Sequence, residues 1–321
     1  MRVCLMIEGQ EGVSWDEWTR IAGLVERHGF EGLFRSDHYV ATIREDSGSL
    51  DAWTTLAGLA ALTKRIRLGT LVSPATFRHP SVLARMAVTV DHVSGGRIDV
   101  GMGSGWFERE HVANGFPFLD ARARFDLFAE QVEVVVRSWT ESGFDHEGAA
   151  YRLEGQSALP RPVQTPHPPL VLGGTVRPRF AALAARFANE VNTLGAPNDE
   201  LRARRARLLR ACEQAGRDPE TLGFSVMTAC FVGADSAEVL DRIRAFLALG
   251  GRDDDPRALL DARRDRWLVG TVDEVAGRIG ELRALGVTRV FLQHLNHSDD
   301  GLVTLVGERL LPEVASLESR A

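Results

Sequence analysis

The 321-residue sequence is nearly without lysine, poor in cysteine and free of long apolar runs. Lys64 is the only lysine, and it falls between an expected helix and an expected strand, which argues against Schiff-base chemistry. The three cysteines, Cys4, Cys212 and Cys230, are far apart and form no Cys-x-x-Cys motif, so neither a zinc site nor a disulfide framework is indicated. No stretch of about 18 apolar residues could cross a membrane, and no secretion signal begins the chain, so we expect a cytoplasmic protein.

The charge and composition narrow the function classes further. A formal net charge of −6 argues against a general affinity for nucleic acid or anionic membranes, so the expected partner is a small-molecule substrate. With 44% hydrophobic and 26% charged residues, the chain can bury one large core, either as a single barrel or as two ordinary domains.

Short apolar or β-branched runs alternate with longer amphipathic segments along most of the chain. Eight of these runs are expected to be strands: 3–7, 32–36, 65–72, 97–102, 170–173, 190–194, 223–232 and 288–294. The alternation predicts an α/β protein with a (β/α)8 TIM barrel and insertions, forming a single domain over residues 1–321. The insertions are an irregular, proline-rich stretch or small hairpin at about 144–169 and a charged excursion with a short helix at about 250–269.

Two glycine-rich turns follow two of the expected strands. The first contains Gly103, Ser104 and Gly105, and the second contains Gly173, Gly174 and Thr175. Backbone N–H groups in such turns can point into a concavity that holds a phosphate or another anion. Glycine also occurs in strand-to-helix turns because its freedom at positive φ lets the helix fold back tightly, so either turn alone is compatible with a purely structural role. Together the two turns suggest a phosphorylated cofactor.

Barrels of this kind take their catalytic residues from the C-terminal ends of the strands. The second expected strand ends at Asp37 and His38, where one side chain can face the pocket while the other turns into the wall and orients it. His38 titrates near neutrality and is a candidate acid or base. The structural alternative is that Asp37 caps the following turn and His38 makes interior hydrogen bonds. Beyond the first glycine turn, Trp106 can form a flat wall for a ring system, and Glu110 lies on a loop that can cover the pocket.

No metal site is expected. Several side chains could face one opening, namely Asp37, His38, His79, His111 and His294. A metal-dependent barrel hydrolase normally carries a His-x-His pair on its first strand, whereas the first strand here runs into Glu8 without one.

Six fragments of the sequence have a specific order and spacing. They are FRSDHY at 34–39, IRLGTLV at 66–72, ATFRHP at 75–80, SGGR at 94–97, GMGSGW at 101–106 and PPLVLGG at 168–174. Together they resemble the bacterial luciferase-like superfamily and, within it, the oxidoreductases that use the deazaflavin coenzyme F420. The resemblance covers most of the chain and agrees with the barrel predicted from periodicity.

The resemblance implies a tricyclic cofactor in the mouth of the barrel. It implies that the phosphate of the cofactor rests on Gly103, Ser104, Gly105, Gly173, Gly174 and Thr175. It also implies a non-proline cis peptide between Leu71 and Val72, behind the ring. The cofactor would then supply the chemistry, which is hydride transfer to or from a small imine, enone or alcohol. Members of the superfamily commonly pair as homodimers.

The chain departs from the sugar-phosphate dehydrogenases of the family. Those enzymes carry Trp four residues after the His and Glu just after the glycine turn, where this chain has Thr42 and Trp106. The departure argues against a sugar-phosphate substrate and leaves His38 as the first candidate proton donor and Glu110 as the second.

Two alternatives remain open from the sequence. One is an FMN-dependent luciferase-like monooxygenase with nearly the same phosphate cradle, and the other is a barrel that binds a cofactor without turnover. The acidic tail of F420 would favour arginines at the rim, although surface salt bridges explain those available equally well: Arg44, Arg78, Arg177 and Arg179.

Overall fold

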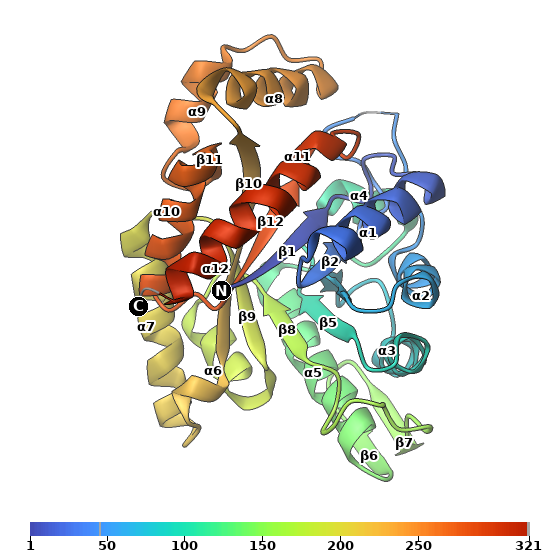
Figure 1. Ribbon diagram of the computed structural model, residues 1–321. Helices are drawn as coiled ribbons and strands as arrows, with labels where there is room; N and C mark the ends of the chain where they lie inside the picture. The colour runs from blue at the N-terminus through green and yellow to red at the C-terminus, as the bar shows by residue number, and fades with distance from the viewer. Residues whose placement is uncertain (45, 320–321) are drawn as a thin grey trace.

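A closed barrel of parallel strands surrounded by helices forms the centre of the computed structural model, which describes residues 1–44 and 46–319 (Figure 1). The eight barrel strands are β1 (Arg2–Ile7), β2 (Gly32–Arg35), β3 (Arg67–Thr70), β5 (Ile98–Gly103), β8 (Leu170–Gly173), β9 (Glu190–Leu194), β10 (Gly223–Gly233) and β12 (Arg289–His294). They neighbour one another in this order, and β12 pairs with β1, with His294 opposite Ile7. The predicted (β/α)8 barrel is therefore confirmed.

Twelve α-helices lie among the described residues. They are α1 (Trp15–His28), α2 (Ala52–Leu62), α3 (Pro80–Ser94), α4 (Glu108–Asn114), α5 (Ala121–Thr140), α6 (Pro178–Phe187), α7 (Asn198–Gln214), α8 (Ser236–Leu249), α9 (Pro256–Arg263), α10 (Val272–Ala284), α11 (Asp300–Leu305) and α12 (Leu311–Ser319). Local signals fix their ends. Helix α1 begins with a capping box between Ser14 and Glu17 and ends at Gly29, whose φ of 81° is left-handed. Among these helices, none is both long and apolar enough to cross a membrane.

Four further strands accompany the eight barrel strands. β4 (Ser73–Pro74) pairs with β5, and β11 (Leu268–Thr271) pairs with the far end of β10. β6 (Phe144–Glu147) and β7 (Arg152–Gln156) form an antiparallel hairpin within the proline-rich stretch at 144–169. In Figure 1, β10 rises beyond the barrel to β11, α8 and α9, so the excursion at 250–269 belongs to a lobe on one side of the barrel.

Side chains alternate between the barrel interior and the helix layer, as they do in any strand. The interior contains an apolar cluster that includes Cys4, Met6, Phe34, Val171 and Phe291, all buried. The rings of Phe34 and Phe291 meet edge to face, with their centroids 4.8 Å apart. This cluster fills the middle of the barrel and leaves the strand C-termini to form a mouth above it.

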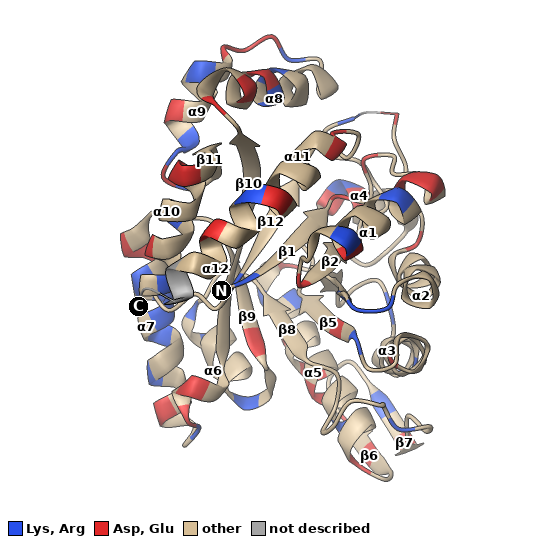
Figure 2. Ribbon diagram, in the orientation of Figure 1, with Lys and Arg blue, Asp and Glu red and all other residues tan. Residues whose placement is uncertain are grey.

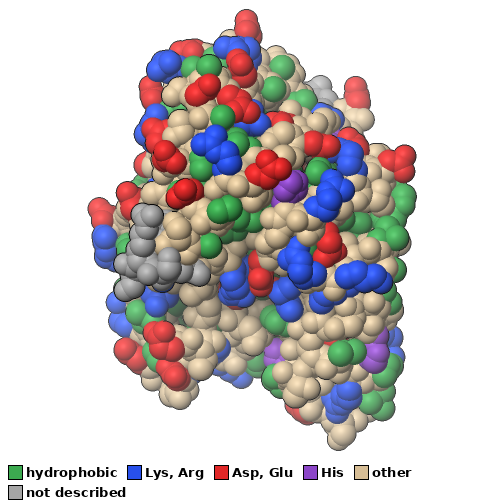
Figure 3. Space-filling view, in the orientation of Figure 1, with side chains coloured by type: hydrophobic (Ala, Val, Ile, Leu, Met, Phe, Trp, Pro, Cys, Tyr) green, Lys and Arg blue, Asp and Glu red, His purple; other side chains and the backbone are tan. Residues whose placement is uncertain are grey.

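Charged residues lie mostly on the helices and loops around the barrel (Figure 2). Positive and negative side chains are interspersed over the face shown in Figure 3. An exception is a buried ionic cluster at the N-terminal ends of the strands, where the Arg289 guanidinium contacts Asp99 and Glu190, each at 2.8 Å. Burial of all three side chains makes this end of the barrel a closed floor.

Candidate active site

The two predicted glycine turns lie side by side at the mouth of the barrel. They follow β5 and β8, which are neighbours with Met102 opposite Leu172. A Cβ atom added to Gly103 would lie 3.5 Å from the carbonyl oxygen of Gly173, so the two strand ends are in contact. The structure therefore brings together two turns that are about 70 residues apart in the sequence.

Val72 explains why glycine occupies both strand ends. A Cβ on Gly103 would approach Val72 Cγ2 to 2.7 Å, and a Cβ on Gly173 would approach Val72 Cγ1 to 2.8 Å. Any larger residue at either position would displace the valine side chain. The peptide bond between Leu71 and Val72 is cis, as the family resemblance implies.

The backbone N–H groups of the two turns differ in whether they already donate a hydrogen bond within the protein. Among the described residues, the N–H groups of Ser104, Gly105 and Thr175 have no hydrogen-bond partner. The N–H of Gly174 instead donates to the carbonyl oxygen of Asn192 at 3.1 Å. The Gly174 amide is therefore not free for the phosphate that the resemblance places at this turn, whereas the other three amides keep the capacity to bind an anion.

A threonine–histidine pair supports the first turn from beneath. Gly105 has a φ of 78°, and a Cβ there would lie 3.0 Å from Thr76 Oγ1 and 3.3 Å from His111 Nε2. His111 Nδ1 lies 2.7 Å from the carbonyl oxygen of Phe107, so Nδ1 carries the proton and Nε2 accepts from Thr76 Oγ1 at 2.7 Å. The sequence did not identify Thr76 as a site residue and considered His111 only as a possible metal ligand, because their contact joins the loop before α3 to helix α4.

His38 and Glu110 form a hydrogen-bonded pair on the neighbouring part of the mouth. His38 follows β2, and its Nδ1 lies 2.8 Å from Glu110 Oε2 on α4. The other carboxylate oxygen of Glu110 accepts from the backbone N–H groups of Tyr39 and, at 3.2 Å, Val40. Glu110 is fully buried and the His38 side chain is 14% exposed, so the carboxylate fixes the ring from inside while the Nε2 side remains accessible.

The Glu110 carboxylate sets the protonation of His38. Burial alone would lower the pKa of the imidazole, but the hydrogen bond and the negative charge of Glu110 outweigh it and raise the pKa above its ordinary value of 6.5. The structure thus keeps the imidazolium form to higher pH than for an unperturbed histidine.

Asp37 occupies a different network from the one expected. Its carboxylate accepts hydrogen bonds from Arg78, at 2.5 and 3.1 Å, and from Ser73 Oγ at 2.5 Å. Arg78 also contacts Asp51 at 2.7 Å and the Tyr39 hydroxyl at 3.1 Å. Asp37 therefore turns into the wall, as expected of one member of the pair, but Glu110 is the residue that orients His38. Arg78 is committed to this network rather than free at the rim.

Aromatic side chains flank His38 at the rim. The Trp106 ring is 64% exposed and lies edge-on to His38, with a centroid separation of 5.9 Å. Phe107 stacks on Trp106 at 5.1 Å and also contacts the His38 ring. Trp106 is thus positioned beside the candidate proton donor, where an exposed ring can contact a bound molecule.

Glu8 and Gln293 complete the mouth on the opposite side. In the order of the barrel strands, β12 lies across from β5 and β1 across from β8. Gln293, on β12, donates from Nε2 to the carboxylate of Glu8, which directly follows β1. Gln10 Nε2 donates to the same carboxylate at 2.9 Å. Alternation along β1 could have identified Glu8, since Cys4 and Met6 face the interior.

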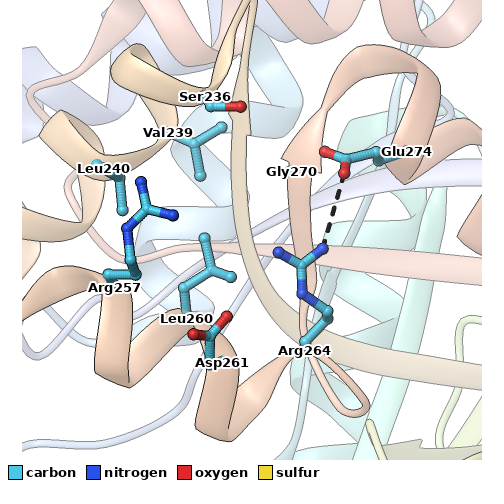
Figure 4. A pocket seen from close by; sticks show the side chains of 9 residues that line it. All are labelled: Ser236, Val239, Leu240, Arg257, Leu260, Asp261, Arg264, Gly270 and Glu274. Carbon is cyan, nitrogen blue, oxygen red and sulfur yellow. Dashed lines mark ion pairs between the residues drawn. The ribbon is translucent and has the colours of Figure 1, made fainter.

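Two other cavities lie away from the mouth. One of about 70 Å³ lies between α8, α9 and the start of α10 (Figure 4). Its charged lining includes Arg264, which pairs with Glu274 at 3.7 Å, and it is too small for a three-ring cofactor. The other, of about 480 Å³, is an apolar groove between α2 and α3. Neither cavity contains a residue predicted for the site.

The candidate metal ligands are dispersed. Asp37 is paired with Arg78, and His111 is bonded to Thr76 and Phe107. His294 is buried with its Nε2 unpartnered, on the outward-facing side of β12. Within the described part of the chain, no three His, Cys, Asp or Glu side chains are grouped as metal ligands.

Known proteins resemble this chain over nearly its whole length. A family model described as luciferase-like monooxygenase matches residues 2–289. An FMNH2-dependent dimethylsulfone monooxygenase from Pseudomonas putida is 26% identical over 96% of this chain and 91% of its own. An F420-dependent glucose-6-phosphate dehydrogenase from Microbacterium testaceum is 28% identical over 91% of each chain. The crystal structure of a monooxygenase from Streptomyces bottropensis matches with a TM-score of 0.82 and 28% identity, over 97% of this chain and 99% of that one.

Proposed function

This chain belongs to the luciferase-like monooxygenase family, and from that membership we propose that it is an oxidoreductase that uses coenzyme F420. In this proposal, hydride passes between the deazaflavin and a small organic substrate such as an imine, an enone or an alcohol. Relatives in the family include both an FMNH2-dependent monooxygenase and an F420-dependent dehydrogenase, so a flavin-type cofactor is common to the family comparisons.

The observation that carries the proposal is the set of free amides at the ends of two adjacent strands. Ser104, Gly105 and Thr175 each present a backbone N–H without a protein partner among the described residues. These groups suit the phosphate that F420 and FMN share, because oriented amides in a turn attract anions. The exposed Arg177, two residues beyond Thr175, can meet an acidic tail and is the main support for F420 over FMN.

The residues present fit a three-ring cofactor in further respects. Leu71 and Val72 would support the ring from behind, the glycines 103, 105, 173 and 174 would leave room for the chain to its phosphate, and Trp106 would contact it from the rim. When bound, reduced F420 supplies hydride and does not form an oxygen adduct, because a carbon replaces the reactive flavin nitrogen.

His38 is proposed as the proton donor. Its Nδ1–H is held by Glu110, so Nε2 is the atom able to donate to a bound substrate or accept from it. Because the pKa of His38 is raised, the imidazolium persists to higher pH than in a free histidine, and it is the form that can give a proton to the substrate. Glu110 acts as a positioning residue through His38, and Asp37 stabilises the wall through Arg78.

An FMN-dependent monooxygenase is the second candidate function. The 26% identity with the dimethylsulfone monooxygenase favours it, since that enzyme is FMNH2-dependent. A barrel that binds the cofactor without turnover is the third reading, and the presence of His38 beside the two glycine turns argues against it.

Titration of the purified protein with F420 and with FMN tests these candidates. The proposal predicts tight F420 binding, hydride exchange with at least one imine, enone or alcohol, and no cofactor-dependent oxygen uptake. Tighter FMN binding with oxygen consumption would establish the monooxygenase instead. Binding of F420 without redox exchange across the panel would favour the binding role.

The resemblance also supports a homodimer. We expect the second copy to pack against exposed apolar side chains of α2 and α3, which include Leu62 and Val82. Sedimentation analysis of the wild type and of Val82→Glu tests this, with a dimer expected only for the wild type.

A further inference from the structure

Glu8 is the acidic group at the mouth that the proposed proton transfer does not use. It directly follows β1, whose residues Cys4 and Met6 face the barrel interior, so the alternation of the strand points Glu8 into the mouth. In the barrel order, β1 lies across from β8 and its glycine turn. A cofactor phosphate at that turn would therefore leave Glu8 on the opposite wall, next to the strand that leads to His38.

Two neutral amides fix the Glu8 carboxylate without neutralising it. Gln293 and Gln10 each donate from Nε2 to this carboxylate. The orientation of Gln10 is itself fixed, because its Oε1 accepts from Ser36 Oγ at 2.5 Å, and Ser36 Oγ accepts from the N–H of Gly9. Two donors occupy only part of the acceptor capacity of a carboxylate, which has about four lone-pair sites.

The charges around Glu8 leave it without a partner cation. Among the described residues, no Arg, Lys or His nitrogen lies within 4.0 Å of the Glu8 carboxylate. The Glu8 charge contributes to raising the pKa of His38, but this one imidazole faces two carboxylates, and Glu110 is the one that holds its Nδ1, at 2.8 Å. Arg109, the arginine of α4, donates to the carbonyl oxygen of Ala41. The wall of the mouth opposite the glycine turns therefore carries unbalanced negative charge.

We propose that Glu8 selects a substrate with a positively charged nitrogen beside the reacting carbon, namely a protonated imine. The proposal rests on the proposed function and narrows its substrate class. A half-buried carboxylate held by neutral donors gains most from a cation that can also donate a hydrogen bond. Phosphate and sulfonate groups are disfavoured at the same place by repulsion.

The reaction that follows is balanced. Hydride from reduced F420 forms a new C–H bond at the imine carbon, and the π electron pair of the C=N bond becomes the lone pair of the amine nitrogen. The imine is reduced to an amine, and the deazaflavin is oxidised. The positive charge of the substrate disappears in the hydride step, and the lone pair of the new amine nitrogen then accepts the proton that His38 Nε2 carries, which is the proton transfer proposed for His38.

Binding of two matched small molecules tests the proposal without requiring turnover. The probes are 2-methyl-1-pyrroline, kept protonated by the choice of pH, and 2-methylcyclopent-2-enone, a neutral molecule of similar size. Calorimetry measures their dissociation constants for the wild type, for Glu8→Gln and for the control Glu108→Gln, with and without F420. Glu108 is an exposed carboxylate on α4. Thermal melting of each variant shows whether it is folded.

We expect Glu8→Gln to weaken binding of the protonated imine about tenfold to a hundredfold, the range for loss of a charge-assisted hydrogen bond. Enone binding should change by less than about threefold, as should every constant in the Glu108→Gln control. Equal losses for both probes would show that Glu8 only supports Gln10 and Gln293 and would overturn the proposal. Wild-type protein that does not prefer the imine, or binds neither probe, would also overturn it. A retained imine preference in a protein that cannot exchange hydride with F420 would instead count against the proposed function alone.

Discussion

The Glu110 carboxylate accepts a hydrogen bond from His38 Nδ1 at 2.8 Å across 72 residues of sequence. His38 lies three residues beyond the end of β2, and Glu110 lies on the short helix α4 that follows the first glycine turn. One contact thereby ties the candidate proton donor to the loop that carries the candidate phosphate site. Protonation of His38 and the position of that loop are coupled through Glu110.

Replacement of His38 by Ala should reduce turnover while leaving the cofactor in place. A general acid contributes about 10² to 10⁴-fold to rate, so kcat should fall by at least about 10²-fold. The F420 dissociation constant should change little, because the free amides at Ser104, Gly105 and Thr175 are untouched. Steady-state kinetics and fluorescence titration measure the two quantities.

His92→Ala provides the control for this experiment. His92 is exposed on α3, far from the mouth in sequence and fold, and its loss should leave both kcat and cofactor affinity unchanged. A large loss of cofactor affinity in His38→Ala, with kcat preserved at saturation, would mean that His38 binds the cofactor and does not transfer a proton.

Glu110→Gln should move the pH profile rather than abolish activity. The wild-type pKa of His38 is raised by Glu110, so removal of the negative charge should lower that pKa. If the imidazolium is the active form, the alkaline limb of kcat against pH shifts to lower pH in the variant. An unchanged limb would show that another group titrates there.

The pH dependence of the free energy of unfolding is a second measure of the raised pKa of His38. A raised folded-state pKa contributes stability that is fully present below the ordinary value of 6.5 and is lost as pH rises through the folded pKa. Glu110→Gln should therefore lower the free energy of unfolding, relative to the wild type, by more at pH 6 than at pH 9. Urea denaturation measures both differences.

His294 should make the protein sensitive to acid. Burial lowers the pKa of this side chain to about 4, against an ordinary 6.5. Stability should be fully present above pH 6.5 and should decline as pH falls from 6.5 toward 4, because only the unfolded chain takes up the proton there. His294→Gln should flatten the decline in denaturation midpoints over this window. An identical slope in the variant would assign the acid sensitivity to other groups.

Much of the barrel could be predicted from the sequence, because both faces of a barrel strand are buried. The run at 170–173 is continuously apolar between prolines and glycines, which identifies a strand without any tertiary information. The third strand is shorter than expected because the Glu26 carboxylate accepts the N–H groups of Arg65 and Ile66. The four-residue β11 was missed because it lies between a charged excursion and a helix and pairs only with the extension of β10.

One part of the candidate site could be predicted from the sequence and another part could not. His38 and the glycine turns could be identified because each follows a strand with a recognisable pattern. Glu110 and Arg78 were named as candidates, but their pairing with His38 and Asp37 could not be predicted, because the contacts cross 72 and 41 residues and depend on loop conformation. The family resemblance, and not the pattern of residues, predicted the cis peptide before Val72.

Gly105→Ala should weaken phosphate binding and lower stability together. The residue has a φ of 78°, and the added Cβ would lie 3.0 Å from Thr76 Oγ1. Alanine in a left-handed conformation costs about 1–2 kcal/mol, so the free energy of unfolding should fall by at least this amount. Cofactor affinity should fall as well, because the amide of residue 105 would rotate away.

Gly143→Ala is the matched control for this substitution. A Cβ at Gly143 would meet no atom within 4 Å, and its φ lies outside the left-handed region. Its stability and cofactor affinity should match the wild type. Gly105→Ala protein that melts lower yet binds F420 and FMN normally would remove this turn from the phosphate site.

Arg289→Met should destabilise the barrel strongly without altering cofactor affinity. The guanidinium is 2% exposed and contacts Asp99 and Glu190 at the floor, so its removal leaves two buried carboxylates without this shared cation. Breaking a buried pair costs about 3–5 kcal/mol, whereas loss of the exposed Arg202–Asp199 pair in Arg202→Met should cost less than about 1 kcal/mol. Urea denaturation compares the two variants. The double variant Arg289→Met with Glu190→Gln should recover part of the free energy of unfolding that Arg289→Met loses, because one of the uncompensated charges is then absent. Equal stability of the two single variants would show that water or rearranged side chains solvate the floor.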